Sequence, residues 1–181
     1  MNRVLISYIA IFTMLSCGQP NKIKEQENKN WGLFEGENFT IEYPIEWELN
    51  SSGLMGTTFI LFSQLTSESD QFKENVNLMI QDLGGENISL NKYVEFSENQ
   101  IKVLATDGVM ITSKRERKNE LEFHKLIYTS RQGIFELKYE QYCWIYNHKA
   151  YVLTFTSEIN SFNDFKKIGE KILNSFEFLI K

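Results

Sequence analysis

Residues 109–157 read VMITSKRERKNELEFHKLIYTSRQGIFELKYEQYCWIYNHKAYVLTFTS, a run rich in the β-branched and aromatic residues that favour strands. Turn residues divide this run into predicted strands at Val109 to Lys118, Leu121 to Ser130, Ile134 to Tyr146 and Ala150 to Ser157. The links between them are too short to hold a crossover helix, so neighbouring strands are expected to run antiparallel. This stretch therefore predicts an antiparallel sheet at the centre of the domain.

Two short links in this run suggest how the strands pair. Asn147 and His148 suit a two-residue turn, and Gln132-Gly133 suits a three-residue hairpin with Gly133 in the left-handed conformation. Counting back from the first of these turns predicts that Tyr146 pairs with Lys149, Trp144 with Tyr151, Cys143 with Val152, and Tyr142 with Leu153.

Both faces of the last two predicted strands are apolar. One parity carries Leu137, Tyr139, Cys143 and Ile145, and the other carries Tyr142, Trp144, Leu153 and Phe155. A sheet with one face open to water alternates more cleanly between apolar and polar residues. We therefore expect both faces of this sheet to be covered.

Further strands and one helix are predicted on the N-terminal side of this run. Residues 38–44 alternate until Pro44 stops the ladder, residues 57–64 form a second candidate, and a third begins at Val76 and ends at Gly84-Gly85. Ser89 to Leu104 predicts an amphipathic helix capped by Ser89. The expected apolar face of this helix consists of Leu90, Tyr93, Val94, Ile101 and Leu104.

A second helix is predicted near the C-terminus. Ser161 is its candidate cap, Asp164 lies favourably in the first turn, and Phe162, Phe165, Ile168, Ile172, Leu173 and Phe176 follow a helical spacing. The predicted fold class is α+β: a mainly antiparallel sheet covered by helices on both faces, as an α/β/α sandwich.

The N-terminus resembles the export signal of a bacterial lipoprotein. Arg3 provides a positive charge, Val4 to Leu15 is apolar and uncharged, and Cys17 follows between the small residues Ser16 and Gly18. Twelve helical residues span about 18 Å, which is short of a membrane crossing. The resemblance to a lipobox implies that residues 1–16 are removed and that Cys17 carries diacylglycerol. The alternatives are an ordinary secretory signal that happens to contain a cysteine and a buried N-terminal strand.

Residues 17–30 are predicted to be a lipidated cysteine followed by a polar tether, and residues 31–181 to be a single domain. After Cys17 the tether has one aliphatic residue, Ile23, and cannot bury enough surface to offset its ordering entropy. The domain would then lie on the order of 20 Å from its anchor. We expect a protein of the bacterial cell envelope, held to the membrane by lipid and facing the periplasm.

The charge balance is unfavourable for binding nucleic acid. The chain has 19 basic and 24 acidic residues, a net charge of −5, and loss of Arg3 with the leader would make it −6. The one basic cluster, Lys114, Arg115, Arg117 and Lys118, is interrupted by Glu116. We interpret it as a solvated hairpin end, with an anion or membrane contact as the alternative.

The sequence contains no recognisable catalytic, cofactor or metal motif. His124 and His148 are the only histidines, and their spacing to Cys143 suits neither a zinc site nor a Cys–His nucleophile pair. Cys143 is expected to be a buried, unreactive thiol. Glu136 and Glu140 are interpreted as outward-facing charges near Lys138 rather than a carboxylate pair. We therefore predict no catalytic residues, no cofactor and no metal.

Two stretches resemble PsbP-like (PsbP/Mog-type) domains. Residues 39–47, FTIEYPIEW, are similar to the opening F-x-I-x-Y-P-x-x-W of that family, and residues 150–155 together with Ser175 to Phe178 are similar to its closing strand, helix and S-F ending. The resemblance covers residues 33 to 180. It implies a sandwich used as a binding or accessory module, with no shared site residues that could be transferred to this chain.

We therefore expect a non-enzymatic accessory or binding lipoprotein that docks a protein partner of unknown identity. One alternative is a carrier that encloses an apolar ligand or lipid, with Tyr139, Tyr142, Trp144 and Tyr151 lining its pocket. The other is an unrecognised hydrolase, which would require a cavity with several converging ionisable groups.

Overall fold

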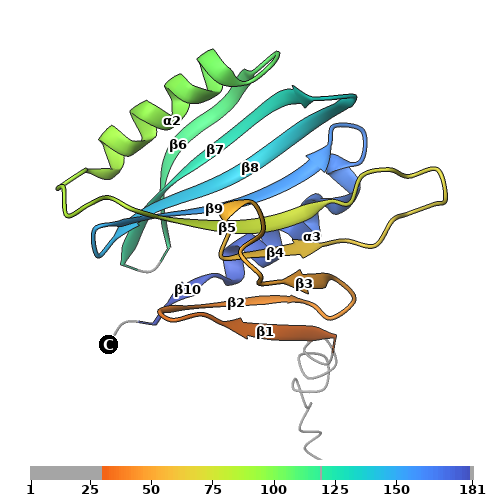
Figure 1. Cartoon of the computed structure of the whole chain (residues 1–181), viewed down its shortest axis with the longest axis horizontal. Helices are drawn as coiled ribbons and strands as arrows, with labels where there is room; N and C mark the ends of the chain where they lie inside the picture. Colours follow the sequence, from red (N-terminus) through yellow and green to blue (C-terminus); the bar gives the residue numbers. More distant parts are fainter. Residues whose placement is uncertain (1–29, 119, 180–181) are drawn as a thin grey trace, which may run out of the picture.

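The computed structural model describes residues 30–118 and 120–179, which form two antiparallel sheets and two α-helices (Figure 1). The signal peptide, Cys17 and residues 18–29 of the predicted tether lie outside the described residues. The elements in chain order are β1 (Trp31–Glu35), β2 (Phe39–Pro44), β3 (Glu48–Asn50), the 3-10 turn η1 (Leu54–Gly56), β4 (Phe59–Phe62), β5 (Asn75–Asp82), α2 (Leu90–Leu104), β6 (Val109–Lys118), β7 (Leu121–Gln132), β8 (Phe135–Tyr146), β9 (Lys149–Glu158), α3 (Phe162–Ser175) and β10 (Glu177–Phe178).

The larger sheet has seven strands in the order β3-β4-β5-β9-β8-β7-β6, and every pair in it is antiparallel. The four consecutive strands predicted from residues 109–157 are its last four. Asn147 and His148 both have positive φ, 49° and 58°, as a two-residue hairpin turn requires. The predicted register between β8 and β9 is confirmed at every pair.

The second hairpin is shorter than predicted. Gln132 pairs with Phe135, so the turn between β7 and β8 has two residues, Gly133 and Ile134, rather than three. Gly133 has the expected left-handed conformation, with φ of 62°. A shift of the pairing by one residue moves every side chain of a strand to the opposite face of the sheet. The length of this turn therefore determines which residues of β7 lie beside those of β8.

A smaller sheet of β1, β2 and β10 was not predicted. The expected strand at 38–44 is β2, but it pairs with the unpredicted strand β1 and with β10 rather than joining the main sheet. Its pairing with β10 joins Phe39 to Phe178, far apart in sequence. The structure therefore confirms mainly antiparallel sheets with two helices, but divides the strands between two sheets.

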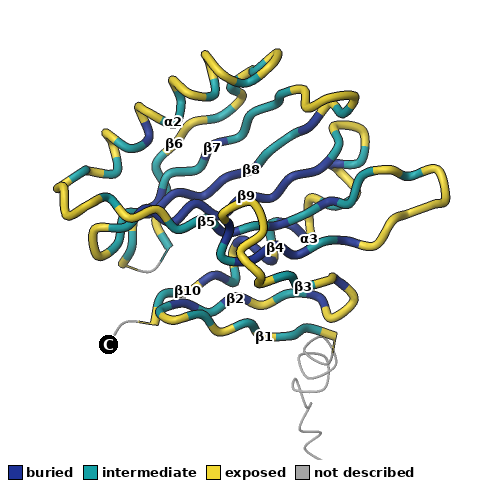
Figure 2. The backbone as a smooth tube through the Cα atoms, viewed as in Figure 1, coloured by how far each residue is buried: buried dark blue, intermediate teal, exposed yellow. Residues whose placement is uncertain are grey.

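Two apolar clusters follow the two parities of the central strands. Figure 2 shows that much of β8 and β9 is buried. The larger one, which includes Tyr142, Trp144 and Leu153, joins the main sheet to α3 and to the small sheet. The smaller one contains Cys143 and Val152 and is joined by residues of α2, which contacts β6, β7 and β8. Apolar residues of both parities are therefore buried, as the pattern in β8 and β9 predicted.

The two helices begin differently. Ser89 caps α2 as predicted, because its hydroxyl accepts a hydrogen bond from the Lys92 backbone N–H at 3.3 Å. Ser161 occupies the cap position of α3, as predicted, but its side chain makes no cap hydrogen bond. The prediction that Leu104 lies on the apolar face of α2 is wrong, because this last residue of the helix is 75% exposed.

Candidate binding surface

The structure describes Cys143 but not Cys17. Cys17, the predicted lipidation site, is outside the described residues. Cys143 is fully buried in the smaller apolar cluster, and burial raises the pKa of its thiol to about 12. His124 is its cross-strand partner in β7, yet the hydrogen bond made to Cys143 Sγ comes from Gln141 Nε2 at 3.4 Å. The thiol is a core group, as expected.

Thiol labelling tests whether Cys143 is protected by burial. The experiment uses the full chain carrying Cys17→Ala, in which Cys143 is the one cysteine left. A pKa of about 12 leaves on the order of a thousandfold less thiolate than a free cysteine has. We expect iodoacetamide to leave Cys143 unmodified in the native protein and to modify it fully in urea. Rapid native labelling would mean that the thiol is accessible.

A serine, a histidine and a glutamate meet beside α2, which the sequence analysis did not anticipate. Ser113 Oγ lies 2.7 Å from His124 Nε2 and also donates a hydrogen bond to Glu98. Burial and the nearby Arg115 lower the pKa of His124. Within the described residues nothing hydrogen-bonds to His124 Nδ1, so this histidine lacks the orienting carboxylate of a hydrolytic triad. His148 lies apart, in its exposed turn.

Glu140 is buried, which corrects the prediction that it faces outward. Lys125 Nζ donates a hydrogen bond to Glu140 Oε1, and the Tyr142 hydroxyl donates to the same oxygen at 3.2 Å. Glu140 shares the parity of Tyr142 in β8, so it points into the larger apolar cluster. The pair was not predicted because its two members come from different strands and because Glu140, despite sharing the parity of Tyr142, is interpreted from the sequence as facing outward. The predicted neighbour Lys138 instead lies over the ring of Phe162 at 4.2 Å.

Glu74 is a second buried carboxyl group that the sequence analysis missed. Burial raises its pKa above the ordinary value of 4.5, and the hydroxyls of Ser63 and Ser157 donate hydrogen bonds to it at 3.3 Å each, which partly opposes that rise. The native state therefore holds this proton more tightly than the unfolded chain does.

The contribution of Glu74 to stability should consequently fall as pH rises from the ordinary glutamate value through the raised pKa of Glu74. Glu74→Gln removes this titration, so we expect the variant to gain stability relative to the native chain as pH increases through that window. Urea unfolding of both proteins across a pH series measures the difference. Parallel stability curves for the two proteins would contradict the expectation.

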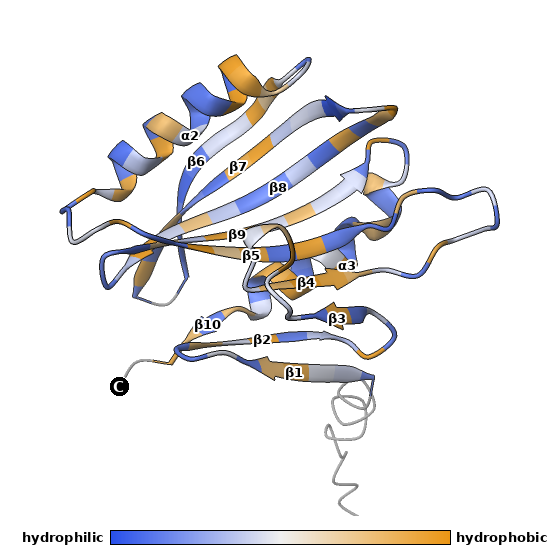
Figure 3. Ribbon diagram, in the orientation of Figure 1, coloured by the Kyte–Doolittle hydropathy of each residue, from blue (hydrophilic) through white to orange (hydrophobic). Residues whose placement is uncertain are grey.

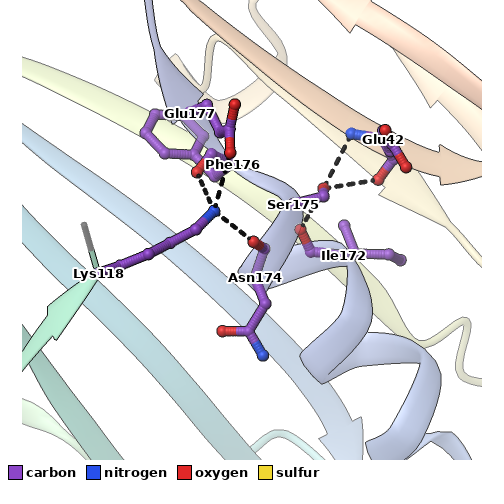
Figure 4. A network of polar contacts seen from close by, with 7 residues as sticks. All are labelled: Glu42, Lys118, Ile172, Asn174, Ser175, Phe176 and Glu177. Atoms are coloured by element: carbon purple, nitrogen blue, oxygen red, sulfur yellow. Dashed lines mark hydrogen bonds and ion pairs between the residues drawn. The ribbon is translucent and has the colours of Figure 1, made fainter.

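The end of α3 joins three parts of the fold (Figure 4). Lys118 Nζ donates hydrogen bonds to the backbone carbonyls of Asn174 at 2.6 Å and Phe176 at 3.1 Å, where a cation is favoured at a helix C-terminus. Ser175 Oγ accepts a hydrogen bond from the Glu42 N–H at 2.9 Å and so attaches β2. A hollow of about 180 Å³ beside Lys118 is smaller than the roughly 300–1,000 Å³ typical of small-molecule sites.

The four aromatic residues proposed to line a carrier pocket pack against other rings. Tyr139 stacks on Tyr128 at a centroid distance of 4.5 Å. Trp144 lies 5.0 Å from Phe176, while Tyr142 and Tyr151 belong with it to the larger core cluster. Tyr142, Trp144 and Tyr151 therefore belong to the core between the main sheet, α3 and the small sheet, whereas Tyr139 packs within the main sheet.

Several exposed aliphatic residues lie near the line where α2 meets β6, which we call the α2–β6 seam. At one end, a hollow of about 430 Å³ is lined by Glu98, Ile101, Lys102, Gly108, Val109 and Met110. Val109, which lines the hollow, is 57% exposed. Three further exposed aliphatic residues lie close to the lining residues in sequence: Val103 (67%), Leu104 (75%) and Ile111 (53%). Figure 3 shows this apolar character in the last turn of α2 and at the start of β6.

The other end of the seam is polar. A second hollow, of about 420 Å³, is lined by Ser89, Leu90, Asn91, Arg115 and Glu122. Arg115 donates a hydrogen bond to Asn91, and the other basic residues of β6 form ion pairs: Lys114 with Glu116, Arg117 with Glu122, and Lys118 with Glu177. The seam thus changes along its length from aliphatic to basic.

The solved structures similar to this chain include the following three. Cyanobacterial PsbP (CyanoP) from Synechocystis sp. PCC 6803 matches with a TM-score of 0.63 and 11% identity, covering 82% of this chain and 92% of its own. LpqN of Mycobacterium tuberculosis, described as involved in cell envelope biogenesis, has a TM-score of 0.62 and 10% identity, with coverages of 90% and 100%. PA94 of Pseudomonas aeruginosa, a protein of unknown function, has a TM-score of 0.57 and 10% identity, with coverages of 81% and 95%.

The chain matches no protein-family model and no curated protein sequence. Its sheets, helices and seam define a mainly antiparallel α+β domain with an accessible apolar surface. The chain has a PsbP-like fold. The resemblance noted at residues 39–47 and near the C-terminus therefore agrees with the structural comparisons.

Proposed function

We propose that this chain is a lipid-anchored, non-enzymatic binding module of the bacterial cell envelope. The observation that supports it most is the α2–β6 seam, because exposed aliphatic side chains gathered around a hollow are typical of surfaces that bind other molecules. In this proposal the helices cover the main sheet on both faces as a sandwich, and the seam lies at the rim of that sandwich.

The proposed anchor is diacylglycerol on Cys17, connected to the domain by residues 18–30. The Asn30 carbonyl accepts a hydrogen bond from the Ile45 N–H at 3.0 Å, which supports a domain that starts close to the end of the proposed tether. No helix within residues 30–118 and 120–179 is long and apolar enough to cross a membrane. The similarity to LpqN, which is described as involved in cell envelope biogenesis, supports an envelope location facing the periplasm.

The chemistry of the side chains supports binding rather than catalysis. The Cys143 thiol is held protonated by burial, which raises its pKa to about 12 and deprives it of nucleophilic character. Ser113 shares its hydroxyl between His124 and Glu98, while the second ring nitrogen of His124 has no partner among the described residues. A serine nucleophile requires a base that is itself oriented.

The anchor is tested by expressing the full chain with Cys17→Ala, with Cys143→Ala as the matched cysteine control. We expect the native chain and Cys143→Ala to incorporate labelled fatty acid and to sediment with membranes. Cys17→Ala should lose the label and leave the membrane fraction. Unchanged membrane retention and acyl mass in Cys17→Ala would exclude the lipid anchor.

A further inference from the structure

The outer side of β6 is a free sheet edge. β6 is the last strand of the seven-stranded sheet and pairs only with β7, whereas the opposite edge is the three-residue strand β3. Within the described residues, the backbone of β6 makes its hydrogen bonds with β7, so alternate N–H and C=O groups over ten residues face away from the sheet. Such an edge is a template for another strand.

The two halves of this edge differ in chemistry. From Val109 to Ser113 the strand has no charge. Val109, which lines the hollow of about 430 Å³, and Ile111 are both exposed. The second half carries Lys114, Arg115, Arg117 and Lys118 against one acidic residue, Glu116. Lysines and a bulge, which here lies between Met110 and Thr112, are the usual protection of an edge against unwanted pairing. The bulge lies in the uncharged half, which therefore has this one protection but carries no charges.

We propose that the β6 edge accepts an extended segment of another protein as an added antiparallel strand. The proposal rests on the proposed function as a binding module and specifies its partner. Aliphatic residues of the segment would pack on Val109, Ile111 and the adjacent hollow. Acidic residues would lie opposite Arg115, which forms no ion pair among the described residues, and would compete with Glu116 and Glu122 for Lys114 and Arg117. Because the strands run in opposite directions, the acidic residues precede the aliphatic ones in the partner sequence.

A second copy of this chain fits the edge poorly. Full-length antiparallel pairing of two β6 strands would place Val109 opposite Lys118 and Ile111 opposite Glu116, so each aliphatic side chain would face a charged one. A second β6 strand offers no run of acidic residues to lie opposite the basic half of the first. Charge complementarity therefore favours a different, acidic segment over self-association.

The test uses the full chain in detergent and two fluorescent peptides, Asp-Glu-Asp-Thr-Val-Thr-Val-Thr and Lys-Arg-Lys-Thr-Val-Thr-Val-Thr. Fluorescence anisotropy gives the affinity of each. Because the chain has a net charge of −5, non-specific attraction would favour the basic peptide. We expect the reverse, with the acidic peptide binding at least about tenfold more tightly and its affinity falling as salt is added.

Two variants locate the binding. Ile111→Lys places a charge in the uncharged half of the edge, at a residue that is 53% exposed. The control Ile134→Lys places the same charge at a residue that is 78% exposed but lies in the β7–β8 turn. We expect Ile111→Lys to weaken the acidic peptide at least about tenfold and Ile134→Lys to leave it unchanged. Thermal unfolding of both variants confirms that they are folded.

Hydrogen exchange provides an independent readout that requires no variant. Bound acidic peptide should slow exchange of backbone amides within residues 109–118. Absence of this protection, preference for the basic peptide, equal loss in both variants, or a dimer that forms through residues 109–118 would each overturn the proposal. None of these outcomes bears on the lipid anchor, which is judged separately by the membrane retention of Cys17→Ala.

Discussion

Replacement of Lys125 by methionine is expected to lower the free energy of unfolding by roughly 3–5 kcal/mol. Lys125 pairs with Glu140, whose side chain is fully buried, while the lysine side chain is 15% exposed. The variant keeps the carboxylate of Glu140 inside the larger apolar cluster but removes its counter-charge. The Tyr142 hydroxyl, at 3.2 Å, is the remaining donor to that carboxylate. Urea denaturation of the full chain measures the loss.

A double variant separates the effect of an unpaired charge from the effect of lost packing. Lys125→Met with Glu140→Leu replaces the pair by apolar groups, which is often neutral or stabilising, so most of the lost stability should return. The surface pair of Lys73 and Glu48, at 3.1 Å, is the matched control, and Lys73→Met should change stability by less than about 1 kcal/mol. Equal losses at Lys125 and Lys73 would refute this account.

This ion pair also shows why parts of the structure could not be predicted from the sequence. Asn147 and His148 permit few turn geometries, so the register between β8 and β9 followed from local sequence and proved correct. The turn at Gly133 allowed two lengths. The longer one was predicted, so the side chains of β7 were placed differently relative to β8, and the diagonal contact between Lys125 and Glu140 was not foreseen.

The small sheet was missed because its pairing depends on contacts between distant parts of the chain. The alternation in residues 38–44 identifies β2 as a strand but does not say which strand lies beside it. The partner strand is selected by packing, because Phe39 stacks on Phe176 at a centroid distance of 5.3 Å and pairs with Phe178 across the sheet. Local patterns predict elements, whereas a partner more than 130 residues away is selected by the assembled core.

The binding surface was only partly visible in the sequence. The basic residues from Lys114 to Lys118 were recognised, and their ion pairs agree with the interpretation of a solvated hairpin end. Leu104, however, was assigned to the buried face because it fits the helical period. Leu104 lies at the end of α2 and is exposed. The periodicity therefore predicted the correct helix, but not the residue at which the helix ceases to be buried against the sheet.

Phe176→Ala is expected to cost about 3–5 kcal/mol of stability, because Phe176 lies where α3 and the two sheets meet. Its ring stacks on Trp144 at 5.0 Å and on Phe39 at 5.3 Å, and it meets Phe178 edge-on at 5.1 Å. One truncation therefore removes contacts to β8, β2 and β10 together. Urea denaturation measures the loss, and tryptophan fluorescence should report the change around Trp144.

A matched exposed residue distinguishes this junction from a general effect of losing a phenyl ring. Phe96, on α2, is 51% exposed, so Phe96→Ala should change stability by no more than about 0.5 kcal/mol. Phe176→Leu keeps part of the buried volume and should fall between Phe176→Ala and the native chain. If Phe176→Ala lost no more stability than Phe96→Ala, the small sheet would be held to the main sheet by contacts other than this aromatic junction.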